Sequence, residues 1–159
     1  MTTDIYQPIS PCFFMKTLLS AACDNALAGL SRSFTEWHVA HCPRSHRFFG
    51  HSPFELRRLR TLGFNICLGT DSLASNSILS LFSEMRELLR KEPWVSPREA
   101  LTMATVNGAH AIGQADLLGR ISPGFRADLI AIPSTETATG AFDSIVAFEG
   151  TVPWMMVEG

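Results

Sequence analysis

The chain has 159 residues, of which 46% are hydrophobic and 18% charged, and its formal net charge is -2. This length falls within the range of one domain and can support a hydrophobic core. The charge balance provides no basic surface for nucleic acid, and no apolar run is long enough to span a bilayer. The four cysteines form no CxxC pair. We therefore expect a reduced, cytoplasmic protein without nucleic-acid or membrane partners.

Residues 1–36 are expected to form an irregular lead-in with one helix, which covers Phe14 to about Leu30. An alternative is a secretion or lipoprotein signal, because a charged residue, a short apolar stretch and small residues precede Cys23. The charge is single, the apolar stretch is short, and the segment does not lie at the extreme N-terminus. These features favour a buried amphipathic helix.

The middle of the chain alternates between strand and helix patterns. His38–Cys42 is predicted to be a short strand that Pro43 stops. Ser52–Glu55 has the sequence of a capping box with proline at the first helical position, and the helix that follows should end at Gly63. Phe64–Leu68 is a short apolar run typical of a buried parallel strand. Strand, helix and strand with short connections predict a β-α-β unit.

Two further helices are expected after this unit. The first starts near Ser77 and carries apolar residues at three-four spacing. The second begins at a capping box, Ser96–Glu99, and closes near Gly113. After Gly119 the chain is expected to be rich in strands, which are predicted at Ala127–Ile132, Ser144–Phe148 and Trp154–Val157.

Asp71 is the first candidate for a catalytic residue. It follows the predicted strand Phe64–Leu68, and in barrels built from strand-helix units the catalytic groups lie where strands meet the following loops. The alternative is that Asp71 shapes a turn through an Asx hydrogen bond, as aspartate often does after a strand. The spacing alone leaves both interpretations open.

Several motifs occur in order along the chain. They are His41-Cys42-Pro43-Arg44-Ser45, Leu68-Gly69-Thr70-Asp71, Ser75-Asn76, Glu84-Met85-Arg86 and Gly124-Phe125-Arg126-Ala127-Asp128-Leu129. From about Val39 to the end, this ordered set resembles the C-terminal third of the metal-dependent amidohydrolase superfamily, closest to its deaminase and chlorohydrolase (ATZ/TRZ-like) branch. A narrower similarity, over His41–His51, is to the aminofutalosine deaminases of menaquinone synthesis.

The resemblance implies an α/β fold. Residues 37–119 would form the C-terminal portion of a TIM-like (β/α)8 barrel, namely its last two strand-helix units. Residues 120–159 would form a β-rich tail that is part of a composite β-sandwich. Because a complete barrel takes about 250 residues, we expect a fragment that arose from a truncated gene, a mis-called start or a frameshift.

The resemblance also implies a site and a reaction. Asp71 would bind a divalent metal, zinc or iron, and help to shuttle a proton, while metal-activated water attacks the amino-bearing carbon of a purine nucleoside-like heterocycle. The substrate would be a small molecule, and the complete enzyme is expected to be a homo-oligomer. The remaining candidates for the substrate pocket are His41, Arg44, His46, Ser75 and Asn76.

The family's HxH pair is absent from this sequence, so the chain alone is expected to be inactive. His38 and His41 cannot replace the pair, because side chains three residues apart on a strand point to opposite faces. One alternative is therefore a non-catalytic remnant or interaction module without a metal site. Another is a small zinc-binding module, since its candidate ligands have types that suit zinc. These ligands are His38, His41, Cys42, His46 and His51.

Overall fold

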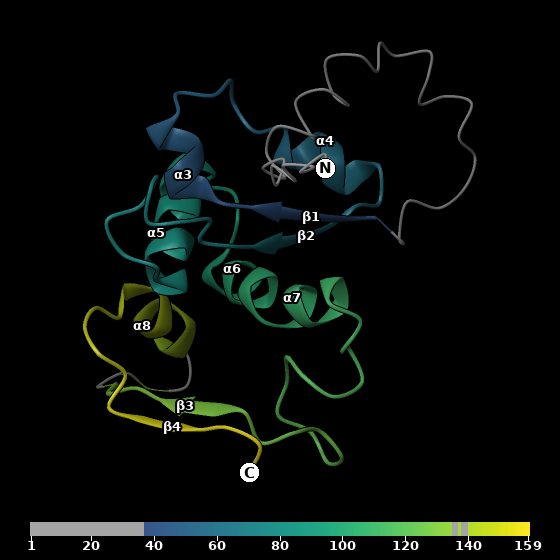
Figure 1. Ribbon diagram of the computed structural model, residues 1–159, viewed down its shortest axis with the longest axis vertical. Helices are drawn as coiled ribbons and strands as arrows, with labels where there is room; N and C mark the ends of the chain where they lie inside the picture. Colours follow the sequence, from purple (N-terminus) through teal and green to yellow (C-terminus); the bar gives the residue numbers. More distant parts are fainter. Residues whose placement is uncertain (1–36, 135–136, 138–139) are drawn as a thin grey trace, which may run out of the picture. The chain divides into compact units, whose positions relative to one another are not determined.

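The computed structural model describes residues 37–134, 137 and 140–159, which lie in one unit that runs from Phe34 to Gly159. The helix expected from Phe14 to Leu30, with its alternative as a signal segment, lies outside the described residues. No helix in the described ranges is long and apolar enough to cross a membrane. The elements are β1 (His38–His41), α3 (Pro43–Phe48), α4 (Leu56–Thr61), β2 (Asn65–Leu68), α5 (Leu81–Lys91), α6 (Pro97–Ala104), α7 (Val106–Ala111), β3 (Leu129–Ala131), α8 (Ala141–Ala147) and β4 (Trp154–Met156) (Figure 1).

The strands β1 and β2 pair in parallel, with His38 opposite Asn65 and His41 opposite Leu68. Two helices, α3 and α4, connect them, so the predicted β-α-β unit is confirmed. The side chains of β1 alternate between exposed and buried, whereas the last three residues of β2 are all buried. Burial on both faces is typical of a strand in a parallel sheet that helices cover. The α/β fold is confirmed at this level.

The helix α5 lies at the centre of the helical packing and contacts α3, α6, α8 and β2. Helices α6 and α7 both pack against β2 (Figure 1). The side chains of Leu56, Leu59, Met85 and Leu88 are among the most deeply buried. The core therefore forms between the short parallel sheet and the helices that pack on it, with Leu56 and Leu59 from α4 and Met85 and Leu88 from α5.

The observed helix starts match the predicted ones where the capping residues lie next to the helix in sequence. In α6 the capping box of Ser96 and Glu99 is present in both directions, as predicted. Helix α5 begins later than the expected Ser77, because the side chain of Ser80 caps it by accepting from the Ser83 N–H. The predicted capping box at Ser52–Glu55 is wrong, since α4 begins at Leu56 without a side-chain cap.

The position of Phe54 gives a physical reason for this late start. Its ring stacks on the imidazole of His41, with centroids 3.9 Å apart and planes 3° from parallel. This contact holds the segment before α4 against the end of β1. Aromatic packing over a distance in sequence has overridden a local capping signal.

The helix expected to run from Ser96 to near Gly113 is broken at Thr105 into α6 and α7. The backbone of Thr105 leaves the helical region, with φ -121° and ψ -81°. Past the break, the Asn107 amide donates to the Ile66 carbonyl oxygen at 2.8 Å, and the Asn107 carbonyl accepts from Asn65 at 3.0 Å. These bonds fix α7 against β2.

The tail contains one helix where a strand was expected. Ser144–Phe148 was predicted to be a strand, but most of it lies in α8. The two-residue β-branched run gives no periodicity that separates strand from helix. Tertiary contacts decide instead, since the Arg86 guanidinium donates to the carbonyls of Val146 and Phe148 at 3.1 and 2.7 Å. Arginine at the end of a helix satisfies its last carbonyls and suits the negative end of its dipole.

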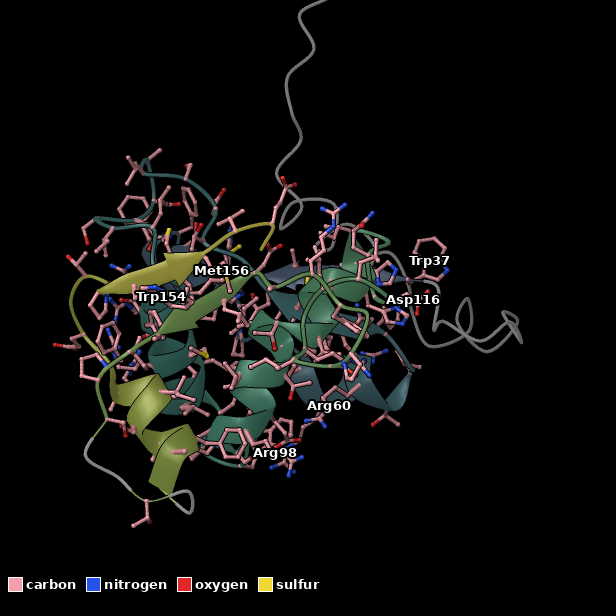
Figure 2. The ribbon with its side chains drawn as sticks, turned by 90° about the horizontal axis from the view of Figure 1, so that it is seen from below. Trp37, Arg60, Arg98, Asp116, Trp154 and Met156 are labelled. Carbon is pink, nitrogen blue, oxygen red and sulfur yellow. The ribbon has the colours of Figure 1, made fainter. Side chains whose placement is uncertain are left out.

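The other two strands of the tail are confirmed. β3 and β4 pair antiparallel, with Leu129 opposite Met156 and Ala131 opposite Trp154. Figure 2 shows Trp154 and Met156 along β4, the last strand of the chain.

A substitution at Gly119 tests how closely the loop after α7 packs against that helix. Its φ is +89°, and a Cβ there would lie 2.9 Å from the Cα of Val106. We expect Gly119→Ala to cost about 1–2 kcal/mol for the left-handed conformation and about 1–3 kcal/mol more for the backbone clash. Gly124→Ala is the matched control, because Gly124 has φ +86° and nothing within 4 Å of the added Cβ. Equal costs in urea unfolding would contradict the described packing of this loop.

Candidate functional site

Asp71 lies just beyond the C-terminal end of β2. The Gly69 N–H donates to the His41 carbonyl at 2.9 Å and extends the pairing of the two strands by one bond. Two residues later, Asp71 has φ +59°, in the left-handed region, which aspartate adopts more readily than most residues other than glycine. The Asp71 side chain is exposed.

Two hydroxyl groups hold the Asp71 carboxylate. Ser45 Oγ lies 2.5 Å from Asp71 Oδ2 and 2.5 Å from Ser75 Oγ, and Ser75 Oγ lies 3.0 Å from the same Oδ2. Each hydroxyl has one proton, so both can donate to the carboxylate, or one can donate to its neighbour. In the described part of the chain, both hydrogen bonds to this carboxylate come from side chains. This favours a functional role for Asp71 over an Asx turn.

Ser45 is a residue that the sequence analysis did not mark as part of the site. It lies in the first turn of α3 and is only 1% exposed. A signal was available, because parallel strands bring their carboxyl ends to one edge of a sheet. Ser45 follows β1 as Asp71 follows β2, so the two loops meet at that edge.

Ser75 and Asn76, which were predicted to line the pocket, are both buried. The Asn76 amide Nδ2 donates to the carbonyl oxygen of Thr70, the residue before Asp71. Ser75 bonds the Asp71 carboxylate directly. These two side chains therefore close the loop from Thr70 to Asn76 upon itself and orient Asp71.

Arg44 connects α3 to the segment before α5. Its guanidinium donates to the Ile78 carbonyl at 2.9 Å and to Ser77 Oγ at 3.0 Å. Its backbone N–H donates to Glu84 Oε2 at 2.9 Å. The guanidinium that was predicted to meet substrate is thus engaged in holding this segment.

His41 and His46 belong to an aromatic cluster at the same edge. The His41 and His46 rings meet edge to face with centroids 5.6 Å apart, and His46 meets His51 similarly at 5.4 Å. Burial, reinforced by His46, lowers the pKa of His41 to about 3. Burial also lowers the pKa of His46, with His51 and Lys91 adding repulsion. Both imidazoles are therefore neutral at physiological pH.

The buried His41 predicts an acid-sensitive fold. Because its pKa falls from about 6.5 in the unfolded chain to about 3 when folded, the unfolded state binds a proton that the folded state does not. Stability is then fully present above about pH 6.5 and is lost as the pH falls toward 3. We expect His41→Phe, which keeps an aromatic ring against Phe54, to flatten this loss in urea unfolding measured against pH. A His41→Phe variant that loses stability toward low pH as steeply as the wild type would contradict the role of His41 in this loss.

The metal ligands that this chain offers are few. Among the described residues, no three His, Cys, Asp or Glu side chains come together as a metal site. The zinc-module alternative built on the cluster from His38 to His51 thus has no support there. The side chain of Cys42, one of its candidate ligands, is buried.

Asp71 fits a metal as one ligand of several. Its carboxylate oxygen is a ligand type that zinc and iron accept, and both described hydrogen bonds fall on Oδ2, which leaves the lone pairs of Oδ1 for another partner. A catalytic zinc site uses three protein ligands and keeps one open position. Because no three such side chains come together among the described residues, at least one further ligand would come from outside them.

Comparison with known families and curated proteins gives a consistent result. The sequence model of the amidohydrolase family matches residues 13–152. A 5-methylthioadenosine/S-adenosylhomocysteine deaminase from Teredinibacter turnerae is 36% identical over 132 residues, which are 79% of this chain and 28% of that protein. The enzyme of the same name from Pyrococcus furiosus is 44% identical over 101 residues, which are 59% of this chain and 24% of that protein.

Comparison with solved structures also finds similarity to deaminases. A zinc-bound adenosine deaminase from Xanthomonas campestris superposes with a TM-score of 0.67 at 27% identity, over 77% of this chain and 31% of that one. The Helicobacter pylori aminofutalosine deaminase superposes with a TM-score of 0.64 at 30% identity, over 74% of this chain and 30% of that one. The chain thus spans less than a third of the length of each of these four proteins.

Proposed function

This chain belongs to the amidohydrolase family, and we propose that it supplies the C-terminal part of a metal-dependent hydrolase that deaminates a purine nucleoside-like heterocycle. The observation that carries the proposal is the Asp71 carboxylate beyond the end of β2, held on Oδ2 by Ser45 and Ser75. The curated relatives and structural neighbours named above are deaminases, which supports this reaction.

The proposed fold is the end of a (β/α)8 barrel. In this proposal β1 and β2 are its last two strands, residues 37–119 form the barrel fragment, and residues 120–159 contribute to a β-sandwich. Active sites of such barrels lie at the C-terminal ends of the strands. The position of Asp71 after β2 and of Ser45 after β1 supports the assignment.

In the proposed mechanism, Asp71 binds a divalent metal, zinc or iron, through the carboxylate that the two serines orient. A divalent metal held there would supply Lewis-acid chemistry and would lower the pKa of water toward neutrality. Asp71 accepts the proton of the attacking water and passes it toward the departing amino group. A carbon–oxygen bond forms, the carbon–nitrogen bond breaks, and ammonia leaves.

The residues around Asp71 have supporting roles in this proposal. Ser45 and Ser75 fix the carboxylate, and Asn76 closes the loop behind it. His41 and His46 stay neutral, so they add no positive charge that would compete with a metal. We place the complete enzyme in the cytoplasm, as a homo-oligomer that acts on a small molecule.

A second candidate is a non-catalytic remnant or interaction module. The observation in its favour is that the described residues bring no three potential metal ligands together. The two candidates differ in one respect that can be measured. Only the first predicts that this segment functions when the rest of a barrel is supplied.

A chimera tests the proposal. In the Pyrococcus furiosus relative, the matching segment of 101 residues is replaced by the corresponding residues of this chain. We expect the zinc-loaded chimera to release ammonia from 5-methylthioadenosine, whereas the relative with the segment deleted does not. A chimera that folds and binds zinc without any deamination would overturn the proposal and favour the non-catalytic candidate.

A further inference from the structure

Two buried oxygen atoms stand out in the part of the chain that the structure describes, because they have no hydrogen-bond partner. They are Glu84 Oε1 and Asn76 Oδ1. Glu84 is 0% exposed and lies in the first turn of α5, and Asn76 is buried in the loop that carries Asp71. Leaving a buried polar atom without a hydrogen-bond partner destabilises the fold, so each such atom in a native core calls for an explanation.

The other atoms of both groups are engaged. Glu84 Oε2 accepts from the Arg44 backbone N–H at 2.9 Å, and the Asn76 Nδ2 donates to the Thr70 carbonyl. The Asn76 side chain is also close enough to the Glu84 carboxyl to act on it, and it lowers the pKa of that carboxyl. Turning the amide over would set Oδ1 against the Thr70 carbonyl, which would place two acceptors together without a proton between them.

The surroundings of Glu84 favour its neutral form. Burial raises the pKa of its carboxyl, and the nearby Glu87 on the same helix adds to the rise. The Arg44 N–H, the Arg44 charge and Asn76 act in the opposite direction, but the pKa remains raised. Among the described residues of α3, α5 and the Asp71 loop, Arg44 and Glu87 are the charged groups that act on it.

We propose that Glu84 is a protonated carboxylic acid whose Oε1–H donates to Asn76 Oδ1, which makes Glu84 a positioning residue for the Asp71 loop. This single proton gives both oxygen atoms, Glu84 Oε1 and Asn76 Oδ1, a hydrogen-bond partner. It joins the first turn of α5 to Asn76, which is bonded to Thr70, the residue before Asp71. The positioning role for catalysis rests on the proposed function, whereas the shared proton does not depend on it.

The direct test is infrared spectroscopy of the full chain near neutral pH. A protonated carboxylic acid has a C=O stretch well separated from that of carboxylates. We expect such a band in the wild type and its loss in Glu84→Gln. Glu87→Gln is the matched control, since Glu87 lies one turn away and its pKa is lowered by the Arg90 side chain, so the band should persist. Absence of the band in the folded wild type would overturn the proposal.

Stability gives the second readout. Glutamine copies the neutral acid, because its NH₂ can donate to Asn76 while its oxygen accepts from Arg44. Glu84→Gln should therefore unfold at or above the wild-type temperature, and Glu84→Ala below it. A raised pKa means that the wild type loses stability as pH rises above the ordinary glutamate range, so the advantage of Glu84→Gln should grow with pH. A Glu84→Gln variant as unstable as Glu84→Ala would contradict a shared proton.

These readouts separate failure of this inference from failure of the proposed function. The infrared band and the unfolding temperatures need neither metal nor substrate. For the positioning role, the chimera with Glu84→Gln should keep its kcat within about threefold, while Glu84→Ala should lose at least about tenfold in kcat with KM nearly unchanged. Equal kcat in both variants would show that Glu84 stabilises the helix without positioning Asp71.

Discussion

Replacing Asp71 with asparagine should lower the kcat of the chimera roughly 100- to 10,000-fold, the range that a positioned acid-base group contributes. The amide has the same shape and can still accept a hydrogen bond from Ser45 or Ser75. It carries no charge to balance a divalent cation and accepts no proton from water. The change therefore separates the chemistry of the group from its place in the loop. Steady-state ammonia release at saturating 5-methylthioadenosine measures it.

Ser72→Ala is the matched control for this variant. Ser72 is the next residue along the loop, and it is exposed. Its backbone carbonyl accepts a hydrogen bond from Ser75, and the substitution leaves that carbonyl in place. The alanine variant should keep kcat near that of the parent chimera. An Asp71→Asn chimera with more than about a tenth of the parent activity would be inconsistent with Asp71 as ligand and proton carrier. Circular dichroism of both variants checks that the fold is retained.

The second large effect concerns the packing of α5. Leu88 is 0% exposed, and its helix contacts α3, α6, α8 and β2. Leu88→Ala removes buried methyl groups and leaves a cavity, which typically costs about 2–5 kcal/mol. This helix also carries Glu84, which bonds to α3, and Arg86, which bonds to the end of α8. We therefore expect Leu88→Ala to weaken the packing of α5 against both helices. Urea unfolding of the full chain gives the free-energy difference.

Leu89→Ala provides the comparison for Leu88→Ala. It makes the same chemical change one residue along the same helix, at a side chain that is only partly buried. Differences in helix propensity cancel between the two, so the gap between their unfolding free energies reports burial. A cost for Leu88→Ala no greater than that for Leu89→Ala would contradict the described orientation of α5.

The sequence allowed the central elements to be predicted where the signals are local. The strand before Pro43 and the apolar run between Gly63 and Gly69 both form, and they pair in parallel. The box of Ser96 and Glu99 caps α6 as expected. In each case the deciding groups lie within a few residues of one another, so the pattern contains the whole interaction.

Predictions failed where distant partners decide. Ser52 does not cap a helix, because Phe54 is held against His41. The run Ser144–Phe148 became helix in contact with α5 and α6, with Arg86 at its end. A short sequence pattern does not encode such contacts, which depend on residues far along the chain.

The residues of the candidate site also separate into those that a local pattern predicts and those that depend on distant partners. The position of Asp71 after a strand could be predicted, since it depends only on the neighbouring pattern. The predicted parallel pairing of β1 and β2 also places Ser45 at this edge, but the hydrogen bond from Ser45 to the carboxylate and the bonds from Arg44 to the segment before α5 could not be predicted. Both contacts span more than twenty residues and arise only when β1 and β2 pair.

The most direct test of the account is the location of the metal relative to Asp71. Anomalous diffraction at the zinc edge, from crystals of the zinc-loaded chimera, places the metal without assumptions about the ligands. The account predicts a zinc ion about 2.0–2.2 Å from a carboxylate oxygen of Asp71, with Ser45 and Ser75 still bonded to the other oxygen. A zinc ion bound in the barrel with the Asp71 carboxylate outside its coordination sphere would contradict it.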